Sequence, residues 1–264
     1  MTQQAQKLFE RHRVTLEDAV QAVATRGFWT PYPESLKKYE EESVKGASAA
    51  FEALCKQHFA LAAPGETRRV GEEVSPYGFE LGITYDQPRT ETLFDAMQAA
   101  MPAWRDAGAR ARVGVCLEIL ARLNAQSPFI GQAVMHTSGQ GPMMAFQAGG
   151  PHAQDRGLEA VAYAWQAMAQ VPEFVRWAKP QSKHDPLILD KRFHIVPRGI
   201  SLVVACSTFP TWNTYPGLFA SLATGNPVIV KPHPGAILPV AMTVRVAQEV
   251  LTEAIEAGGT TLRD

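Results

Sequence analysis

The sequence predicts an α/β protein in which a helical N-terminal layer precedes the beginning of a parallel β-sheet. Between residues 91 and 170, apolar side chains recur every three or four positions, which is the spacing of one face of a helix. After residue 193 the apolar residues form short runs bounded by turn residues, in the order strand, helix, strand. This order is typical of a parallel sheet whose strands are joined by a helix.

The N-terminal part is expected to be mainly helical. A capping-box pattern at residues 15–18 and Gly27 mark the two ends of a first helix. Two prolines favour an extended surface arm at residues 28–33, and residues 47–59 have the apolar spacing of a second helix. Packed helices are predicted over residues 93–104, 113–123 and 158–168, followed by a polar connector at residues 179–190.

The C-terminal part is expected to contain two short buried strands, over residues 200–205 and 227–230. A helix at residues 218–223 lies between them, and another extends from Val240 to about Glu256, with Pro239 at its start. Parallel strands present their carboxyl ends at one edge, where ligands bind. The residues that follow the strands, near Cys206 and Lys231, are therefore the candidate site.

Composition and charge exclude several classes of protein. With 46% hydrophobic and 19% charged residues among 264, the chain is of ordinary globular composition, and its formal net charge of -1 predicts neither nucleic acid nor membrane as a partner. The three cysteines have no metal-type spacing and are too few for a disulfide framework. The sequence has neither a signal-peptide pattern nor a membrane-length apolar run, so we expect a cytoplasmic protein.

Several motifs in order along the chain resemble the aldehyde dehydrogenase superfamily. They are the segments at residues 101–105, 137–140, 196–200, 209–210 and 225–232. The superfamily binds nicotinamide cofactors without the Gly-x-Gly-x-x-Gly fingerprint, which this chain also lacks. Residues 8–13, 32–35 and 206–213 resemble more closely the phenylacetate-degradation (PaaN-type) members.

The resemblance implies a division of the chain into three parts. Residues 1–46 would form an N-terminal helix and aromatic arm, 47–190 a helical part with a connector, and 191–264 a partial Rossmann-like domain for NAD or NADP. The catalytic domain, with its cysteine nucleophile and its base, would be absent, and residues 257–264 do not resemble the family. We therefore expect a truncated or frameshifted chain that is inactive alone.

The resemblance also implies the reaction. A cysteine thiolate attacks an aldehyde, hydride passes to the nicotinamide, and water releases the acid. The substrate class would be a CoA-linked semialdehyde, and the family implies a homo-oligomer.

The resemblance places cofactor-binding residues at Ala205, Cys206, Ser207, Lys231, Pro232, His233 and Pro234. Lys231 would hydrogen-bond the adenosine ribose. Pro234 falls where many members carry a ribose-binding glutamate, so the choice between NAD and NADP stays open. His233 is interpreted as an ordinary polar loop residue. Cys206 is interpreted as a small buried group rather than a nucleophile.

The next segment carries the substrate-side candidates. Thr208 occupies the position of the family's oxyanion-stabilising asparagine, although it could equally cap a helix that begins near Phe209. The family's substrate tunnel would be lined by Phe209, Trp212 and Asn213, with a core role favoured for Phe209. Outside this segment, a solvated turn is predicted at His184 and Asp185, and structural roles at His136 and His152.

Alternatives from different classes remain open at this point. One is a CoA-acylating aldehyde dehydrogenase, in which a thiol replaces water. Another is a non-catalytic nucleotide-binding or subunit-interaction module, and a third is an unstable fragment of a misread gene, with an uncovered sheet face.

Overall fold

A computed structural model describes residues 3–256, with side-chain contacts from residue 5 to residue 254. The prediction about residues 257–264 lies outside the described residues. The helices are α1 (Gln3–Arg11), α2 (Arg13–Thr25), α3 (Glu41–Leu54), α4 (Thr90–Asp106), α5 (Ala109–Ala125), α6 (Ser127–Ser138), α7 (Pro142–Gly149), α8 (Pro151–Ala169), α9 (Tyr215–Ala223) and α10 (Leu238–Glu256), with a 3₁₀ turn at Leu36–Lys38. The strands are β1 (His58–Phe59), β2 (Thr67–Val70), β3 (Val74–Ser75), β4 (Phe79–Glu80), β5 (Thr84–Pro88), β6 (Phe174–Gln181), β7 (His184–Arg192), β8 (Ser201–Val204) and β9 (Val228–Lys231).

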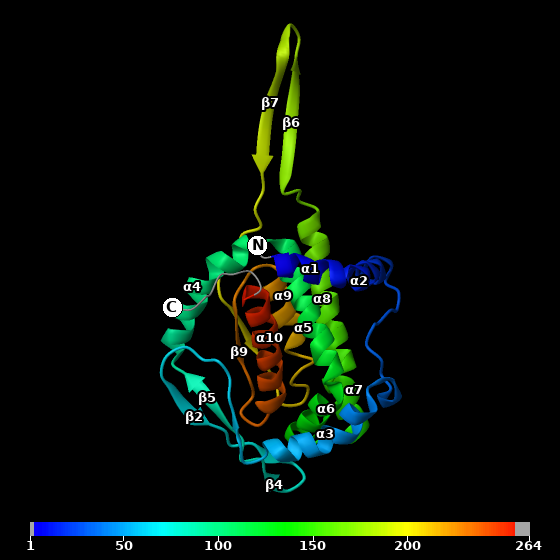
Figure 1. The fold of residues 1–264 in the computed structure, drawn as a ribbon, viewed down its shortest axis with the longest axis vertical. Helices are drawn as coiled ribbons and strands as arrows, with labels where there is room; N and C mark the ends of the chain where they lie inside the picture. The colour runs from blue at the N-terminus through cyan, green and yellow to red at the C-terminus, as the bar shows by residue number, and fades with distance from the viewer. Residues whose placement is uncertain (1–2, 257–264) are drawn as a thin grey trace.

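Helix α5 lies at the centre of the helical layer, in contact with α1, α8, α9 and α10 (Figure 1). Its predicted apolar face is confirmed, because Val113, Cys116, Leu120 and Leu123 are all fully buried. Helix α4 forms as predicted but lies at the periphery, with no buried residue. The prediction that its apolar face packs like that of α5 is wrong.

A buried arginine joins three helices of this layer. Arg112 of α5 is 1% exposed, and its guanidinium donates to the carbonyl oxygens of Arg105 (2.8 Å) and Ala223 (3.0 Å). These carbonyls lie at the C-terminal ends of α4 and α9, where helix dipoles are negative and carbonyl groups lack intrahelical partners. Two helix ends therefore take the place of a carboxylate partner.

The N-terminal segment differs from its prediction in two respects. Helix α2 begins at Arg13 without a side-chain cap, because α1 runs almost directly into it, so the capping box does not form. The aromatic arm is non-helical and exposes Phe28 as predicted, but it also packs on the helical layer: Tyr32 is buried, and the Thr30 hydroxyl donates to Asp155 of α8.

A small sheet in the order β1-β5-β2 precedes α4 and was not predicted from the sequence. A two-stranded sheet of β3 and β4 lies next to it in the chain. At Gly71 there is no room for a side chain, since a Cβ atom would lie 2.1 Å from the carbonyl oxygen of Ile83. The backbones therefore approach as closely as only glycine permits.

The prediction of an irregular polar connector at residues 179–190 is wrong, because this segment belongs to an antiparallel hairpin of β6 and β7. The hairpin projects from the helical body (Figure 1). Trp177 lies opposite Leu189, and Lys191 lies over the Trp177 ring at 5.0 Å. Cross-strand pairs of this kind stabilise the ribbon although its polar sequence suggested a loop.

Strands β8 and β9 are parallel and follow the predicted strand, helix, strand order. Val203 is buried on the side of α9, whereas Leu202 and Val204 are 65% and 64% exposed. The prediction of a fully buried first strand is therefore wrong for one of its faces. No helix within the described residues is long and apolar enough to span a membrane.

Candidate functional site

The two loops singled out by the sequence leave the sheet at the same edge. Val204 pairs with Lys231 in the β8–β9 register, and the Ala205 amide donates to the Lys231 carbonyl at 3.0 Å. The loop that begins at Ala205 and the loop that begins at Pro232 therefore start side by side. This adjacency follows from the parallel pairing of the strands.

Cys206 organises the first loop through its sulfur atom. The Sγ atom accepts hydrogen bonds from the Phe209 amide (3.4 Å) and from the Asn213 side-chain amide (3.0 Å). Ser207 lies half-buried in the same loop. The thiol closes a turn, which is a structural use of the side chain.

Thr208 is exposed, and its carbonyl oxygen accepts a hydrogen bond from the Gln140 side chain. The alternative in which Thr208 caps a helix is wrong, because residues 209–214 form turns and α9 begins at Tyr215, preceded by Thr214. Gln140 is a contact that spacing along the sequence could not reveal. Gln140 links the connection between α6 and α7 to the first loop.

The aromatic residues after Thr208 contact one another. The rings of Phe209 and Trp212 meet edge to face with centroids 5.3 Å apart, and Trp212 also meets His152 at 6.3 Å. Both aromatic residues are half-buried, whereas Asn213 is exposed. His152 in turn pairs with Glu34 of the N-terminal arm at 3.1 Å. Residues from three distant segments thus gather here.

The second loop folds back on itself before α10. Lys231 and Pro234 are exposed, and Pro232 is half-buried. The His233 ring accepts from the Gly235 amide through Nδ1 at 3.1 Å, and His233 forms a backbone bridge with Ala236. Within the described residues no ion pair of Lys231 is found, so its ammonium group stays available to a ligand.

Glu73 is a buried charged residue that the sequence did not single out. It is 2% exposed, and it lies between β2 and β3, yet its carboxylate contacts the N-terminus of α10. Burial raises the pKa of this carboxyl group, while hydrogen bonds from Tyr85, Leu238 and Ile237 act in the opposite direction. No local pattern around Glu73 signals a contact that joins residues so far apart.

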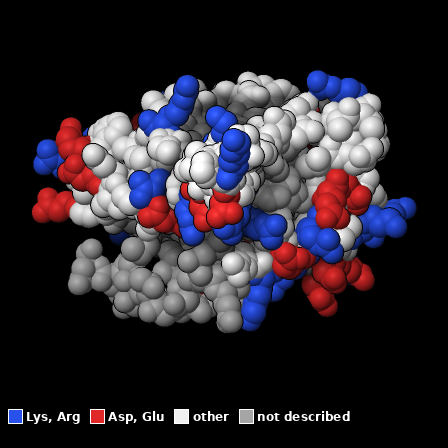
Figure 2. All heavy atoms as spheres, turned by 90° about the horizontal axis from the view of Figure 1, so that it is seen from above, with Lys and Arg blue, Asp and Glu red and all other residues white. Residues whose placement is uncertain are grey.

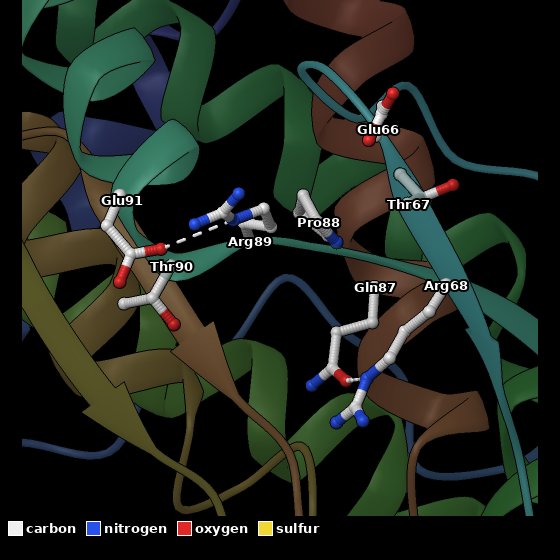
Figure 3. Close-up of a pocket in the computed structure, with 8 residues that line it drawn as sticks. All are labelled: Glu66, Thr67, Arg68, Gln87, Pro88, Arg89, Thr90 and Glu91. Carbon is white, nitrogen blue, oxygen red and sulfur yellow. Dashed lines mark hydrogen bonds and ion pairs between the residues drawn. The ribbon is translucent and has the colours of Figure 1, made fainter.

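A pocket of about 400 Å³ lies elsewhere, where β2 and β5 meet the start of α4 (Figure 3). Arg68 donates to Gln87 at 2.7 Å, and Arg89 lies 3.7 Å from Glu91, so both arginines already have partners. None of the predicted site residues lines this pocket. The part of the chain that the structure describes contains no group of three metal-ligating side chains.

No family model matches the chain, and no curated protein does. Among solved structures, an NAD-dependent aldehyde dehydrogenase from Burkholderia multivorans matches 96% of this chain with 54% sequence identity and a TM-score of 0.91. The chain spans 45% of that protein.

More distant structures share the fold alone. A 1-pyrroline-5-carboxylate dehydrogenase from Thermus, with bound NAD, matches 84% of the chain at 16% identity and a TM-score of 0.61, and the chain covers 43% of it. An aldehyde dehydrogenase from Physcomitrella patens matches 75% at 17% identity and a TM-score of 0.54, with 39% of its own length covered. The chain has an α/β aldehyde-dehydrogenase-like fold, which confirms the predicted fold class.

Proposed function

We propose that this chain is part of an NAD(P)-dependent aldehyde dehydrogenase and that its two loops, residues 205–207 and 231–234, bind the adenosine half of NAD or NADP. The observation that supports this most is the 54% identity to an NAD-dependent aldehyde dehydrogenase over 96% of the chain. The adjacency of Ala205 and Lys231 at one sheet edge agrees with it.

The residues of this edge fit a dinucleotide. The exposed ammonium group of Lys231 is a donor for ribose hydroxyls, and Pro234 adds no competing charge. Cys206 and Asn213 hold the first loop in a tight turn against which a flat group can lie. When bound, the nicotinamide ring of the cofactor would accept hydride from the aldehyde adduct.

Calorimetric titration of the 264-residue chain with NAD and with NADP tests the proposal. We expect Lys231→Met to weaken binding about tenfold, the loss of one charge-assisted hydrogen bond. Lys183→Met, at the tip of the hairpin, is the matched control and leaves binding unchanged. Failure of the unaltered chain to bind either dinucleotide would refute the proposal.

The phenylacetate-degradation subgroup and a CoA-linked semialdehyde substrate form the finer part of the proposal. They are supported by the segment Cys206–Asn213, whose cysteine and asparagine are hydrogen-bonded to each other. Trp212 and Asn213 are the proposed substrate-side contacts, and Thr208 the oxyanion-side group. Tighter binding of a CoA-linked aldehyde than of the free aldehyde, in the presence of NAD, is the expected result.

We further propose that these 264 residues alone do not oxidise an aldehyde. The three cysteines are free thiols, which suits a reducing cytoplasm. Burial raises the pKa of the Cys116 thiol to about 12 and also raises the pKa of Cys55, and Cys206 is engaged in its turn. Neither Cys116 nor Cys55 therefore offers a ready thiolate, and the Cys206 sulfur is held within its own loop. NADH formation that Cys206→Ala abolishes would contradict this proposal.

The β6–β7 hairpin favours association with a second copy of the chain. Phe174, Trp177, Leu187, Ile188 and Leu189 are between 38% and 51% exposed on this narrow ribbon. Seen from the hairpin end, basic and acidic side chains alternate over the surface rather than forming a field of one sign (Figure 2). An apolar arm of this kind is a typical docking element between subunits.

Sedimentation analysis tests the role of the hairpin. Ile188→Lys should shift the chain toward monomer, because a charge would have to be buried at the interface. Lys183→Met at the hairpin tip serves again as the control. Equal sedimentation of the unaltered chain and Ile188→Lys would rule out the hairpin as an interface between copies of the chain.

A further inference from the structure

The carboxylate of Glu73 caps the N-terminus of α10, the helix that follows the proposed ribose-binding loop. Its Oε1 atom accepts hydrogen bonds from the backbone amides of Ile237 (2.6 Å) and Leu238 (3.0 Å), the residues at the start of α10. Its Oε2 atom accepts from the Tyr85 hydroxyl at 2.5 Å. Glu73 and Leu238 are 165 positions apart in the chain.

Backbone contacts near the two small sheets position Glu73. The Glu73 carbonyl accepts from the Leu81 amide at 3.0 Å, and two positions earlier Gly71 allows the backbone to approach Ile83. Tyr85 is itself a buried residue of β5. Glu73 therefore lies in a short segment between β2 and β3 that is hydrogen-bonded to neighbouring backbone.

Hydrogen-bond donors partly offset the burial that raises the pKa of the Glu73 carboxyl group. The Tyr85 hydroxyl and the amides of Ile237 and Leu238 all donate hydrogen bonds to the carboxylate. The ionised carboxylate can accept all three, because it carries no proton of its own. The positive end of the α10 dipole favours the same form. A helix N-terminus attracts phosphate when its amides are free. At α10 the amides of Ile237 and Leu238 already donate to Glu73.

The negative charge lies next to the turn that carries Pro234. His233 and Ala236 form a backbone bridge across this turn, and Ile237, whose amide Glu73 binds, directly follows Ala236. Pro234 offers no charge that could distinguish a ribose hydroxyl from a phosphate. The Glu73 carboxylate supplies a negative charge at the end of the same turn.

We propose that Glu73 is a specificity-determining residue that disfavours the 2′-phosphate of NADP and so makes the loop at residues 231–237 selective for NAD. This inference rests on the proposed function of that loop. Glu73 acts in two ways: it occupies the helix amides that would otherwise bind a phosphate, and its charge repels one. The Tyr85 hydroxyl donates to the carboxylate but carries no charge of its own that would act on a phosphate.

The ratio of NADP to NAD affinity separates selectivity from mere structural support. Calorimetry of the 264-residue chain should show tighter binding of NAD than of NADP. Glu73→Gln keeps the shape and an amide-accepting oxygen but removes the charge, and should raise the affinity for NADP relative to NAD about fivefold or more. Tyr85→Phe keeps the charge and should leave the ratio unchanged.

Tyr215→Phe is a matched control on a neighbouring helix, because it removes a buried hydrogen bond to Thr243 of α10 (2.9 Å) away from the turn. It should lower the thermal midpoint without changing either affinity. A purely structural Glu73 would weaken both dinucleotides equally, and that unchanged ratio in Glu73→Gln overturns the inference. Equal affinities of the unaltered chain for NAD and NADP overturn it without any variant.

The same titrations keep the two proposals apart. Binding of NAD that Lys231→Met weakens, together with an unchanged ratio in Glu73→Gln, leaves the proposed function standing and refutes only the role of Glu73. Absence of binding of either dinucleotide refutes both.

Discussion

Helix α5 and strand β8 are both rich in apolar residues, but their surroundings differ. Helices α1, α8, α9 and α10 pack around α5, so its apolar residues and even Arg112 are removed from solvent. Strand β8 contacts α9 on one face only, and Leu202 and Val204 point away from it into solvent. Apolar sequence alone therefore does not determine burial, because burial requires a second layer on each face.

The largest effect is expected from Arg112→Met in the helical layer. This substitution leaves the carbonyls of Arg105 and Ala223 buried without a donor, which should lower the free energy of unfolding by about 3–5 kcal/mol. Urea unfolding measures the change. Arg13→Met, on the surface of α2, should change stability by less than about 0.5 kcal/mol. A similar small loss for Arg112→Met would mean that the helix ends do not depend on it.

Gly114→Ala probes the contact between α5 and α1. A Cβ atom at this position would lie 2.5 Å from the Phe9 amide nitrogen, which is backbone and cannot turn aside. We expect a loss of about 1–3 kcal/mol as α1 is displaced. Gly46→Ala in α3, where a Cβ meets nothing within 4 Å, is the control and should not destabilise. Equal effects of the two substitutions would contradict the close packing of α1.

Asp155→Asn tests the seam between the N-terminal arm and α8 through its pH dependence. Burial raises the pKa of Asp155 from 3.8 to about 6, so the folded chain binds this proton more tightly than the unfolded chain. The protonated Asp155 side chain therefore contributes to the free energy of unfolding near pH 4, and this contribution is lost as the pH rises through about 6.

The asparagine variant keeps an acceptor for the Thr30 hydroxyl without carrying a charge. Above pH 6 we expect it to be more stable than the unaltered chain by about 1–2 kcal/mol, allowing for partial exposure, with the difference vanishing toward pH 4. Thermal unfolding between pH 4 and pH 8 measures this, with Asp18→Asn as the control. A difference that does not vary with pH would contradict the assignment.

The smallest effect is expected on the open face of the sheet. Val204→Thr should change the free energy of unfolding by less than about 0.5 kcal/mol, whereas Val203→Thr, at 9% exposure, should cost about 1–3 kcal/mol. Denaturant unfolding of the two neighbouring variants makes the comparison within a single strand. Equal losses would show that both faces of β8 are covered in solution.

Local patterns in the sequence determined the helices α5 and α8, the order of β8, α9 and β9, and the adjacency of the loops at Cys206 and Lys231. Helical spacing and the parallel pairing of consecutive strands are properties of short segments, and they can be recognised without any long-range contact. The resemblance to aldehyde dehydrogenases came from the same motifs.

Only the tertiary structure decided which surfaces are closed and which charges are buried. The pairing of β6 with β7, the open face of β8, and the positions of Arg112 and Glu73 depend on segments that meet in the folded chain. Glu73 and Ile237 are 164 residues apart, and neither residue has a neighbour in sequence that signals the contact. Burial is a property of the assembled layers, so a carboxylate that would be expected at the surface becomes the N-terminal partner of α10.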